Sequence, residues 1–187
     1  MRIITGELRG RRLRSPSTDN VRPTSDRVKE AVFSMIMPYL SPGFVAVDLF
    51  TGSGNLGLEA VSRGASTVYF SDDSRESIAL AKTNIKTCGV ENRAVLLAGD
   101  YRHNISRIRQ SVDIYFLDPP YAMGYLLPAL DAIREAGNLK PGGLVVCEHS
   151  HKDSLPEEIE GYELVTVRKY GATGVTIYRR PLTDREA

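Results

Sequence analysis

The feature that most constrains the fold is a regular alternation, beginning at Phe44, between short apolar runs and stretches with helical periodicity. Short continuous apolar runs are typical of buried strands, and the segments between them are long enough to form helices. Because strand–helix–strand crossovers are right-handed and cover both faces of a sheet, the sequence predicts an α/β, doubly wound, mostly parallel sheet. The expected strands are 45–49, 67–70, 95–97, 114–117 and 143–147, with helices at 56–62, 75–88 and 126–136.

Both ends of the chain depart from this pattern. Residues 162–169 and 175–179 have the composition of strands and are separated by a short turn that contains glycine. We expect them to form an antiparallel hairpin that closes one edge of the sheet. Near the N-terminus, the polar trio 24–26 offers helix caps, and apolar residues recur at helical spacing from 28 to 36, before Pro38 stops the pattern.

The chain has the size and composition of one globular domain. Its 187 residues are 42% hydrophobic and 25% charged, without a low-complexity linker, so we expect a single domain over 1–187. No apolar run approaches the roughly 20 residues of a membrane helix, and the start lacks the hydrophobic stretch of a secretion signal, which predicts a cytoplasmic protein. Cys88 and Cys147 lie far apart, and His149 and His151 have no further ligands beside them, so no disulfide or metal site is expected.

A glycine-rich segment, residues 48–57, follows the first expected strand and opens a helix. Backbone amides and the positive end of a helix at such a turn suit a nucleotide-like ligand, and the glycines allow it to approach the chain. Alone, the spacing of Gly52, Gly54 and Gly57 also matches the dinucleotide fingerprint. Asp48 at the strand end favours S-adenosylmethionine, because a carboxylate accepts from the ammonium of a methionine moiety and repels a pyrophosphate.

Acidic residues also follow the next two expected strands. Asp72 or Asp73 stands where a carboxylate can accept from both ribose hydroxyls, and we choose Asp72 because it directly ends the apolar run. Asp100, after Gly99, can accept from an adenine amino group, although capping of a helix explains it equally well. The cofactor residues predicted from these motifs are Asp48, Phe50, Gly52, Ser53, Gly54, Gly57, Asp72, Asp73, Gly99 and Asp100.

The sharpest motif is Asp118-Pro119-Pro120-Tyr121, which ends the fourth expected strand and which we predict to be the catalytic site. Two prolines remove two amide donors, so the carbonyls and the Asp118 carboxylate form a group of acceptors that suits an amino group. Hydrogen bonds to Asp118 and to the Pro119 carbonyl would make an exocyclic base nitrogen a better nucleophile toward a methyl group held in line. Tyr121 offers a face on which an extruded base stacks; a proline-rich turn with a core tyrosine is the alternative explanation.

Together, these motifs resemble a known family. Residues 48–57 and 118–121 resemble amino-methyltransferases that act on nucleic acid bases. Residues 2–6, 9–11, 22–30 and 57–65 are similar to the bacterial 16S ribosomal RNA (guanine(966)-N2)-methyltransferases, and the similarity covers nearly the whole chain. The resemblance implies a Rossmann-like class I methyltransferase fold and transfer to the N2 of one guanine in small-subunit RNA. It also implies that the segment from Arg22 to Phe33, including Thr24, helps to hold the methionine end of the cofactor.

A basic segment at residues 1–20 is the expected RNA contact. Residues 2–13 are long enough for a short hairpin, and the net charge of the chain is only +1, so the positive charge there is local. Charge runs are usually solvated surface, but beside a base-modifying site phosphate contact is the better interpretation. The predicted RNA-binding residues are Arg2, Arg9, Arg11, Arg12 and Arg14.

Two other functions stay open on the residues alone. An adenine-N6 methyltransferase acting on DNA or RNA would use the same acceptors, although the DNA enzymes normally need a recognition domain for which this chain has no room. A non-catalytic RNA-binding module would keep the fold and lose cofactor affinity. We expect a monomer that acts on 16S ribosomal RNA, or on an assembly particle of the small ribosomal subunit, and that has no membrane partner.

Overall fold

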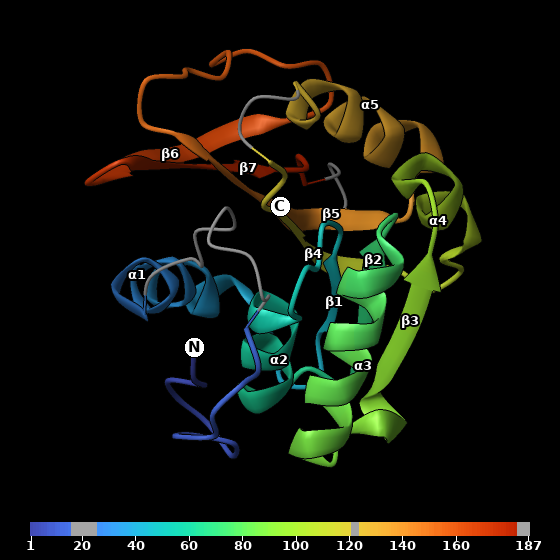
Figure 1. The fold of residues 1–187 in the computed structure, drawn as a ribbon. Coiled ribbons are helices and arrows are strands. Elements are labelled where there is room, and N and C mark those ends of the chain that lie inside the picture. Colours follow the sequence, from blue (N-terminus) through green and yellow to red (C-terminus); the bar gives the residue numbers. More distant parts are fainter. Residues whose placement is uncertain (16–25, 121–123, 183–187) are drawn as a thin grey trace.

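A computed structural model describes residues 1–15, 26–120 and 124–182 and shows helices on both faces of one sheet (Figure 1). The helices are α1 (Asp26–Ile36), α2 (Asn55–Ser62), α3 (Arg75–Cys88), α4 (Tyr101–Arg107) and α5 (Leu126–Ala136), with short 3-10 turns at Met37–Tyr39 and Glu91–Arg93. The strands are β1 (Val45–Asp48), β2 (Thr67–Asp72), β3 (Ala94–Ala98), β4 (Val112–Leu117), β5 (Leu139–Ser150), β6 (Glu163–Tyr170) and β7 (Thr173–Arg179). None of the helices described is long and apolar enough to cross a membrane.

The sheet has seven strands in the order β3-β2-β1-β4-β5-β7-β6. β1 to β5 pair in parallel, whereas β7 pairs antiparallel with both β5 and β6. The predicted doubly wound sheet and its antiparallel C-terminal hairpin are therefore confirmed. The hairpin inserts its second strand next to β5 and leaves β6 at the edge, and only Gly171 and Ala172 lie between the two strands, a tighter turn than the sequence predicts.

Two cores lie on the two faces of the sheet, because successive strand residues point to opposite sides. In β4, Ile114 and Phe116 belong to the core under α1, α2 and α3. Tyr115 and Leu117 belong to the core under α4 and α5. The ring centroids of Phe116 and of Phe33 in α1 lie 5.4 Å apart. The sheet is thus covered on both faces, as the apolar strands predict.

The expected helices begin and end close to their predicted limits. The side chain of Ser74 accepts from the backbone N–H of Ser77 at the start of α3, and Gly89 ends that helix in the left-handed region. The sequence pattern did not predict α4, a short helix that follows β3. Asp100 caps this helix, so the helix-capping explanation of this residue is confirmed.

The N-terminal hairpin is part of the core and not a free arm. Arg2 and Arg12 form an antiparallel bridge, and the N–H of Ile3 donates to the carbonyl of Arg11 over 2.9 Å. Ile3, Leu8 and Leu13 are buried in the core under α1 to α3. Residues 2–12 thus pair across a short hairpin, while residues 16–20 of the predicted basic segment lie outside the described residues.

Candidate active site

The glycine-rich turn between β1 and α2 surrounds a buried carboxylate. Asp48 is 1% exposed, and its Oδ2 accepts from the Thr51 hydroxyl and from the N–H of Gly57, each over 2.9 Å. Burial raises the pKa of Asp48 to about 7, against the effect of those two hydrogen bonds, and the charges of Asp118 and Asp72 raise it further. Asp48 is therefore a desolvated acid whose ionised form a nearby cation would favour.

The three glycines of the turn have different roles. Gly52 and Gly54 have φ angles of +50° and +81°, in the left-handed region that favours glycine. Gly57 instead faces β2, because a Cβ there would lie 2.3 Å from the Phe70 ring. Gly57 thus permits α2 to pack closely on the sheet, and its N–H donates to Asp48. We call residues 48–57, for which the sequence predicts a cofactor, the cofactor loop.

Asp72 lies at the same turn, whereas Asp73 is exposed. One oxygen of Asp72 accepts from the N–H of Gly52 and the other from the N–H of Ser74, both over 2.9 Å. Burial raises the pKa of Asp72, and the two backbone donors lower it. Of the two acids that follow β2, Asp72 is the one in contact with the cofactor loop.

The turn after β3 lies at the same carboxyl edge of the sheet, next to the end of β2. Gly99 has φ +119°, and its N–H donates to the carbonyl of Asp72 over 2.9 Å, which joins the ends of β2 and β3. Oδ1 of Asp100 accepts from the N–H groups of Arg102 and His103 over 2.9 and 3.3 Å as the cap of α4. Capping occupies that oxygen, and the other, Oδ2, lies 4.0 Å from the Arg102 guanidinium.

Three aromatic residues meet above the carboxyl ends of different strands. The Phe50 ring lies 5.5 Å from Tyr101 and 5.7 Å from Tyr125, measured between centroids. Phe50 follows β1, Tyr101 begins α4, and Tyr125 precedes α5. The Tyr101 hydroxyl is buried without a hydrogen-bond partner among the described residues. Phe50 was among the predicted site residues. Tyr101 and Tyr125 were not, because they are far from Phe50 in sequence.

The Asp-Pro-Pro motif lies at the same edge of the sheet as the glycine turn. Phe116 pairs in register with Asp48, so Asp118 stands two residues beyond Asp48 along the neighbouring strand. The charge of Asp118 contributes to the raised pKa of Asp48. Pro119 is buried and Pro120 exposed, while Tyr121 and Thr24 lie outside the described residues.

Glu148 and His149 lie on β5, the strand that pairs with β4 next to the Asp118 motif. Leu117 pairs with Cys147, so the fully buried Glu148 stands beside Asp118. The ring nitrogens of His149 instead contact the Ser150 carbonyl and the Thr176 hydroxyl, each over 2.9 Å. In the part of the chain that the structure describes, no group of three or more His, Cys, Asp or Glu residues is arranged to hold a metal ion.

A second group of buried charges lies beneath the site, between α1 and α2. Nζ of Lys29 lies 3.1 Å from Glu59, and Nε of Arg63 lies 2.8 Å from it. Glu59 also accepts from the N–H groups of Ile4 and Thr5 over 2.9 and 3.1 Å. Glu59 and Arg63 are four residues apart, about one helical turn, a spacing that favours such a pair. Lys29 was missed, although a lysine among apolar residues of α1 is a signal of a buried charge.

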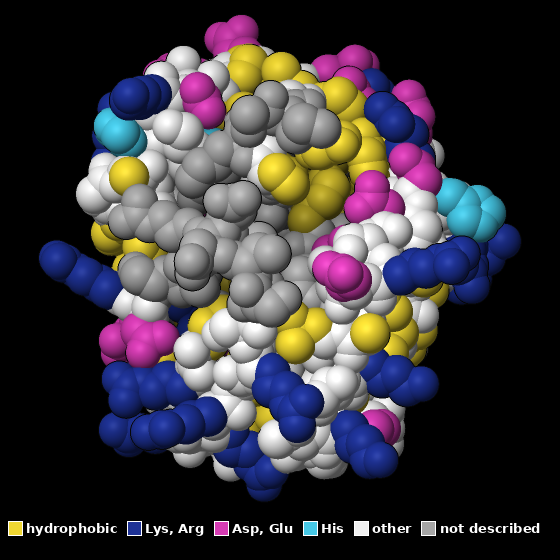
Figure 2. Space-filling model, in the orientation of Figure 1, with side chains coloured by type: hydrophobic (Ala, Val, Ile, Leu, Met, Phe, Trp, Pro, Cys, Tyr) yellow, Lys and Arg dark blue, Asp and Glu magenta, His cyan; other side chains and the backbone are white. Residues whose placement is uncertain are grey.

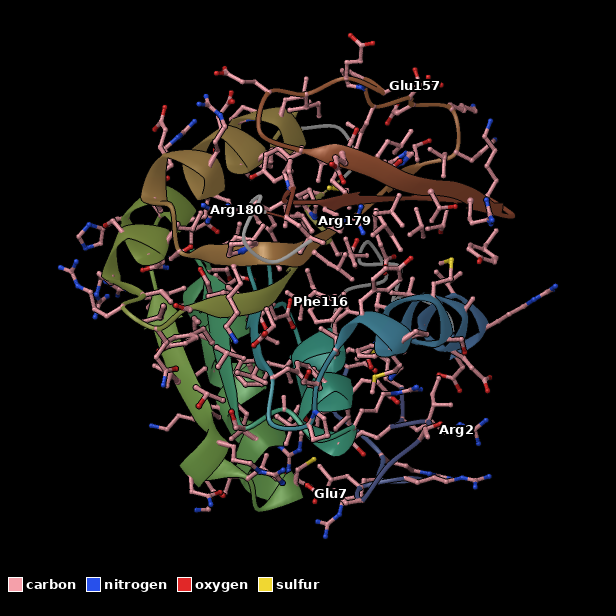
Figure 3. The ribbon with its side chains drawn as sticks, turned by 180° about the vertical axis from the view of Figure 1, so that it is seen from behind. Arg2, Glu7, Phe116, Glu157, Arg179 and Arg180 are labelled. Carbon is pink, nitrogen blue, oxygen red and sulfur yellow. The ribbon has the colours of Figure 1, made fainter. Side chains whose placement is uncertain are left out.

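The predicted RNA-binding arginines are on the hairpin, and most of their side chains are exposed. Arg2 pairs with Asp26 over 2.9 Å, and Arg11 donates to the carbonyl of Thr87 in α3 over 2.8 Å. Figure 2 shows Lys and Arg side chains gathered over the end of the molecule that holds the hairpin and α3. In Figure 3, Arg2 and Glu7 lie on the hairpin, at the opposite end of the molecule from Glu157. The exposed Lys82 and Lys86 of α3 extend this basic surface beyond the predicted residues.

The strand order and the acids at the carboxyl edge define a class I methyltransferase fold, and solved structures share it. A putative methyltransferase, yhhF, from Escherichia coli superposes with a TM-score of 0.84 and 27% identity, covering 98% of this chain and 99% of the other. A putative methylase from Haemophilus influenzae, HI0767, superposes with a TM-score of 0.77 and 29% identity, covering 96% and 98%.

The family model described as Conserved hypothetical protein 95 matches residues 1–179, and the chain belongs to this family. A putative rRNA methyltransferase, YlbH, from Bacillus subtilis is 37% identical over 183 residues, which are 96% of this chain and 99% of the relative. The ribosomal RNA small subunit methyltransferase D of Escherichia coli is 32% identical over 187 residues, covering 96% and 90%. The resemblance found in the sequence is confirmed at the level of the family.

Proposed function

We propose that this protein transfers a methyl group from S-adenosylmethionine to the exocyclic N2 of a guanine in 16S ribosomal RNA, as a cytoplasmic monomer. The observation that carries the proposal is the convergence of Asp48, Asp72 and Asp118 with a glycine-rich turn at one edge of the sheet. Relatives named as small-subunit rRNA methyltransferases support the choice of RNA. The substrate is the RNA itself or an assembly particle of the small subunit.

The residues at this edge fit S-adenosylmethionine. Asp48 is a buried acid with a raised pKa, so a ligand ammonium would restore its charged form. Asp72 offers carboxylate oxygens for ribose hydroxyls, and a Cβ at Gly52 would meet nothing within 4 Å, which leaves room for close approach to the backbone there. When bound, the cofactor supplies a methyl group on a positively charged sulfur. The proposed binding set also contains four residues that border these and three further predicted residues: Ser53, Gly57, Gly99 and Asp100, and then Thr24, Phe50 and Asp73.

The Asp118 motif would hold the target amine. Asp118 and the Pro119 carbonyl accept from its N–H bonds, which orients the nitrogen and stabilises the positive charge that develops on it. Pro120 fixes the backbone of the turn, and Tyr121 supplies the face for an extruded base. No covalent bond to the protein is required, because these residues act by binding, orienting and charge stabilisation.

The test is methyl transfer from tritium-labelled S-adenosylmethionine to purified 16S ribosomal RNA, to a small-subunit assembly particle and, in parallel, to DNA, followed by identification of the methylated nucleoside. N2-methylguanosine is expected. N6-methyladenosine would establish the adenine alternative, and label found only in DNA would exclude RNA as the substrate. Calorimetry with S-adenosylmethionine separates the third possibility, since a non-catalytic RNA-binding module would bind RNA without affinity for the cofactor. Mapping the nucleotide that loses its methyl group in cells lacking the protein then gives the position.

A further inference from the structure

Lys29 bridges the N-terminal hairpin and the cofactor loop from α1. Its ammonium group donates to the carbonyl of Arg2 in the hairpin and to the side-chain oxygen of Asn55 in the loop, each over 2.7 Å. Glu59 provides the third contact, over 3.1 Å. The lysine is fully buried, so all three of its donors are used inside the protein.

Asn84 makes a second, independent bridge from α3. Its amide nitrogen donates to the carbonyl of Arg14 over 3.0 Å and to the carbonyl of Ser53, in the cofactor loop, over 2.8 Å. Its amide oxygen accepts from the N–H of Arg14 over 2.8 Å. Asn84 is also fully buried. Two side chains from different helices therefore join the two ends of the hairpin segment to Ser53 and Asn55, which are two residues apart in the loop.

The hairpin lies along α2 with its open end at the cofactor loop. At its tip, the N–H groups of Glu7 and Leu8 donate to the carbonyl and hydroxyl of Ser62, at the other end of α2, each over 3.0 Å. A Cβ at Gly6 would lie 1.8 Å from the Ser62 carbonyl oxygen. The hairpin is thus held along its length, and its arginines remain exposed on the outer side.

We propose that Lys29 and Asn84 are positioning residues that couple the two binding sites, so that RNA on the hairpin raises affinity for the cofactor. A displaced hairpin would leave buried donors and acceptors of both residues unsatisfied, so the hairpin and the loop have to move together. RNA that binds the exposed arginines of this packed hairpin therefore also stabilises the arrangement of the loop that the cofactor binds. This inference rests on the proposed function.

The coupling is measured by equilibrium dialysis of radiolabelled S-adenosylhomocysteine, which cannot be turned over, against the full chain at low salt. Saturating 16S ribosomal RNA is expected to lower its Kd about fivefold, a typical coupling between sites. Reciprocity requires S-adenosylhomocysteine to tighten RNA binding by the same factor. An unchanged Kd in the presence of RNA would overturn the coupling and leave the proposed function standing. Failure to bind S-adenosylhomocysteine with or without RNA would overturn both.

Variants of α3 assign the coupling to Asn84. Asn84→Ala, and Asn84→Asp as a variant that keeps the shape of the side chain, should reduce the effect of RNA on the Kd to less than about twofold. Thr83→Ala is the matched control on the same helix, because the Thr83 hydroxyl donates to the carbonyl of Ala79 within α3 and to no other described residue. Full coupling in a folded Asn84 variant, or its loss in Thr83→Ala, would overturn the role of Asn84.

Discussion

Two groups of buried charge lie close together in this protein, and they are satisfied in different ways. In the group between α1 and α2, Lys29 and Arg63 surround Glu59, and backbone N–H groups take up the remaining lone pairs of the carboxylate. At the carboxyl edge of the sheet, Asp48 and Asp72 accept only from N–H and hydroxyl groups, and neither forms an ion pair with another described residue.

The two groups differ in what compensates their charges. Burial lowers the pKa of Lys29, and the charge of Glu59 acts against that change, so the pair is compensated inside the protein. Burial raises the pKa of Asp48 and of Asp72. A buried acid in that condition favours a positively charged or hydrogen-bond-donating ligand. The charges of the paired group are thus compensated inside the protein, whereas the acids at the sheet edge favour such a ligand, which supports the proposed binding site.

The largest expected effect is on catalysis at the sheet edge. Asp118→Ala should lower turnover about a thousandfold or more, about 4 kcal/mol, because the carboxylate that holds the target amine is removed. Affinity for S-adenosylmethionine should change by less than about threefold. Methyl-transfer assays and calorimetry measure the two quantities. Asp131→Ala, which removes an exposed acid paired with Arg134, is the control, and normal turnover in Asp118→Ala would exclude the proposed role.

Breaking the paired group should act on stability instead. Lys29→Met leaves Glu59 with one cation fewer inside the protein, and removing one partner of a buried pair typically costs about 3 kcal/mol or more. The free energy of unfolding from denaturant titration measures the loss. Arg2→Ala, which breaks the exposed Arg2–Asp26 pair, should change it by less than about 1 kcal/mol. Equal losses of unfolding free energy in the two variants would contradict the larger contribution expected from the buried pair.

The basic surface of the hairpin should govern RNA affinity and its dependence on salt. Replacing Arg9, Arg11 and Arg12 with Ala should weaken RNA binding and make the slope of log K against log salt shallower by about 2 to 3, nearly one unit for each phosphate that is no longer neutralised. Filter binding at several salt concentrations measures this. The control is alanine at Arg134, Lys140 and Arg179, which are ion-paired elsewhere on the molecule. An unaltered slope in the hairpin variant would contradict the assignment.

The smallest expected effect is a pH dependence of the affinity for S-adenosylmethionine, caused by the titration of Asp48. Because a ligand ammonium favours the ionised acid, affinity for S-adenosylmethionine should rise roughly tenfold from about pH 5.5 to about pH 7. Over that range the ligand amino group stays charged, as its pKa is about 8. Calorimetry across the range measures the rise, and Asp48→Asn should bind more weakly with a flat profile. A profile that is equally steep in the variant would show that another group titrates.

The same shift predicts a change in the stability of the unliganded protein. The pKa of Asp48 is about 7 in the folded state, above its ordinary value of 3.8. Its contribution to stability is therefore complete below about pH 4 and is lost as the pH rises through about 7. The difference in unfolding free energy between the parent and Asp48→Asn should change in that window.

Local patterns were enough to predict most of the elements. The alternation of apolar runs with helical stretches predicted β1 to β5 and their helices, and the limits of α5 agree with the expected 126–136. Ser74 and Gly89 marked the ends of α3 because capping and left-handed conformations depend on local residue type. The acids after β1, β2 and β4 reach one edge because strands in a parallel sheet share their direction. The helix α4 was missed, since its seven residues give only a weak periodicity.

The sequence by itself determined the parallel sheet, the hairpin at its edge, the glycine-rich turn and the Asp-Pro-Pro motif, because each depends on residues that are neighbours along the chain. Only the tertiary structure decided that β7 lies between β5 and β6, that Phe50, Tyr101 and Tyr125 meet, and that Lys29 and Asn84 join the hairpin to the cofactor loop. These contacts link residues far apart in sequence. Their partners are selected by burial and by the need to satisfy polar groups away from water, which no local pattern specifies.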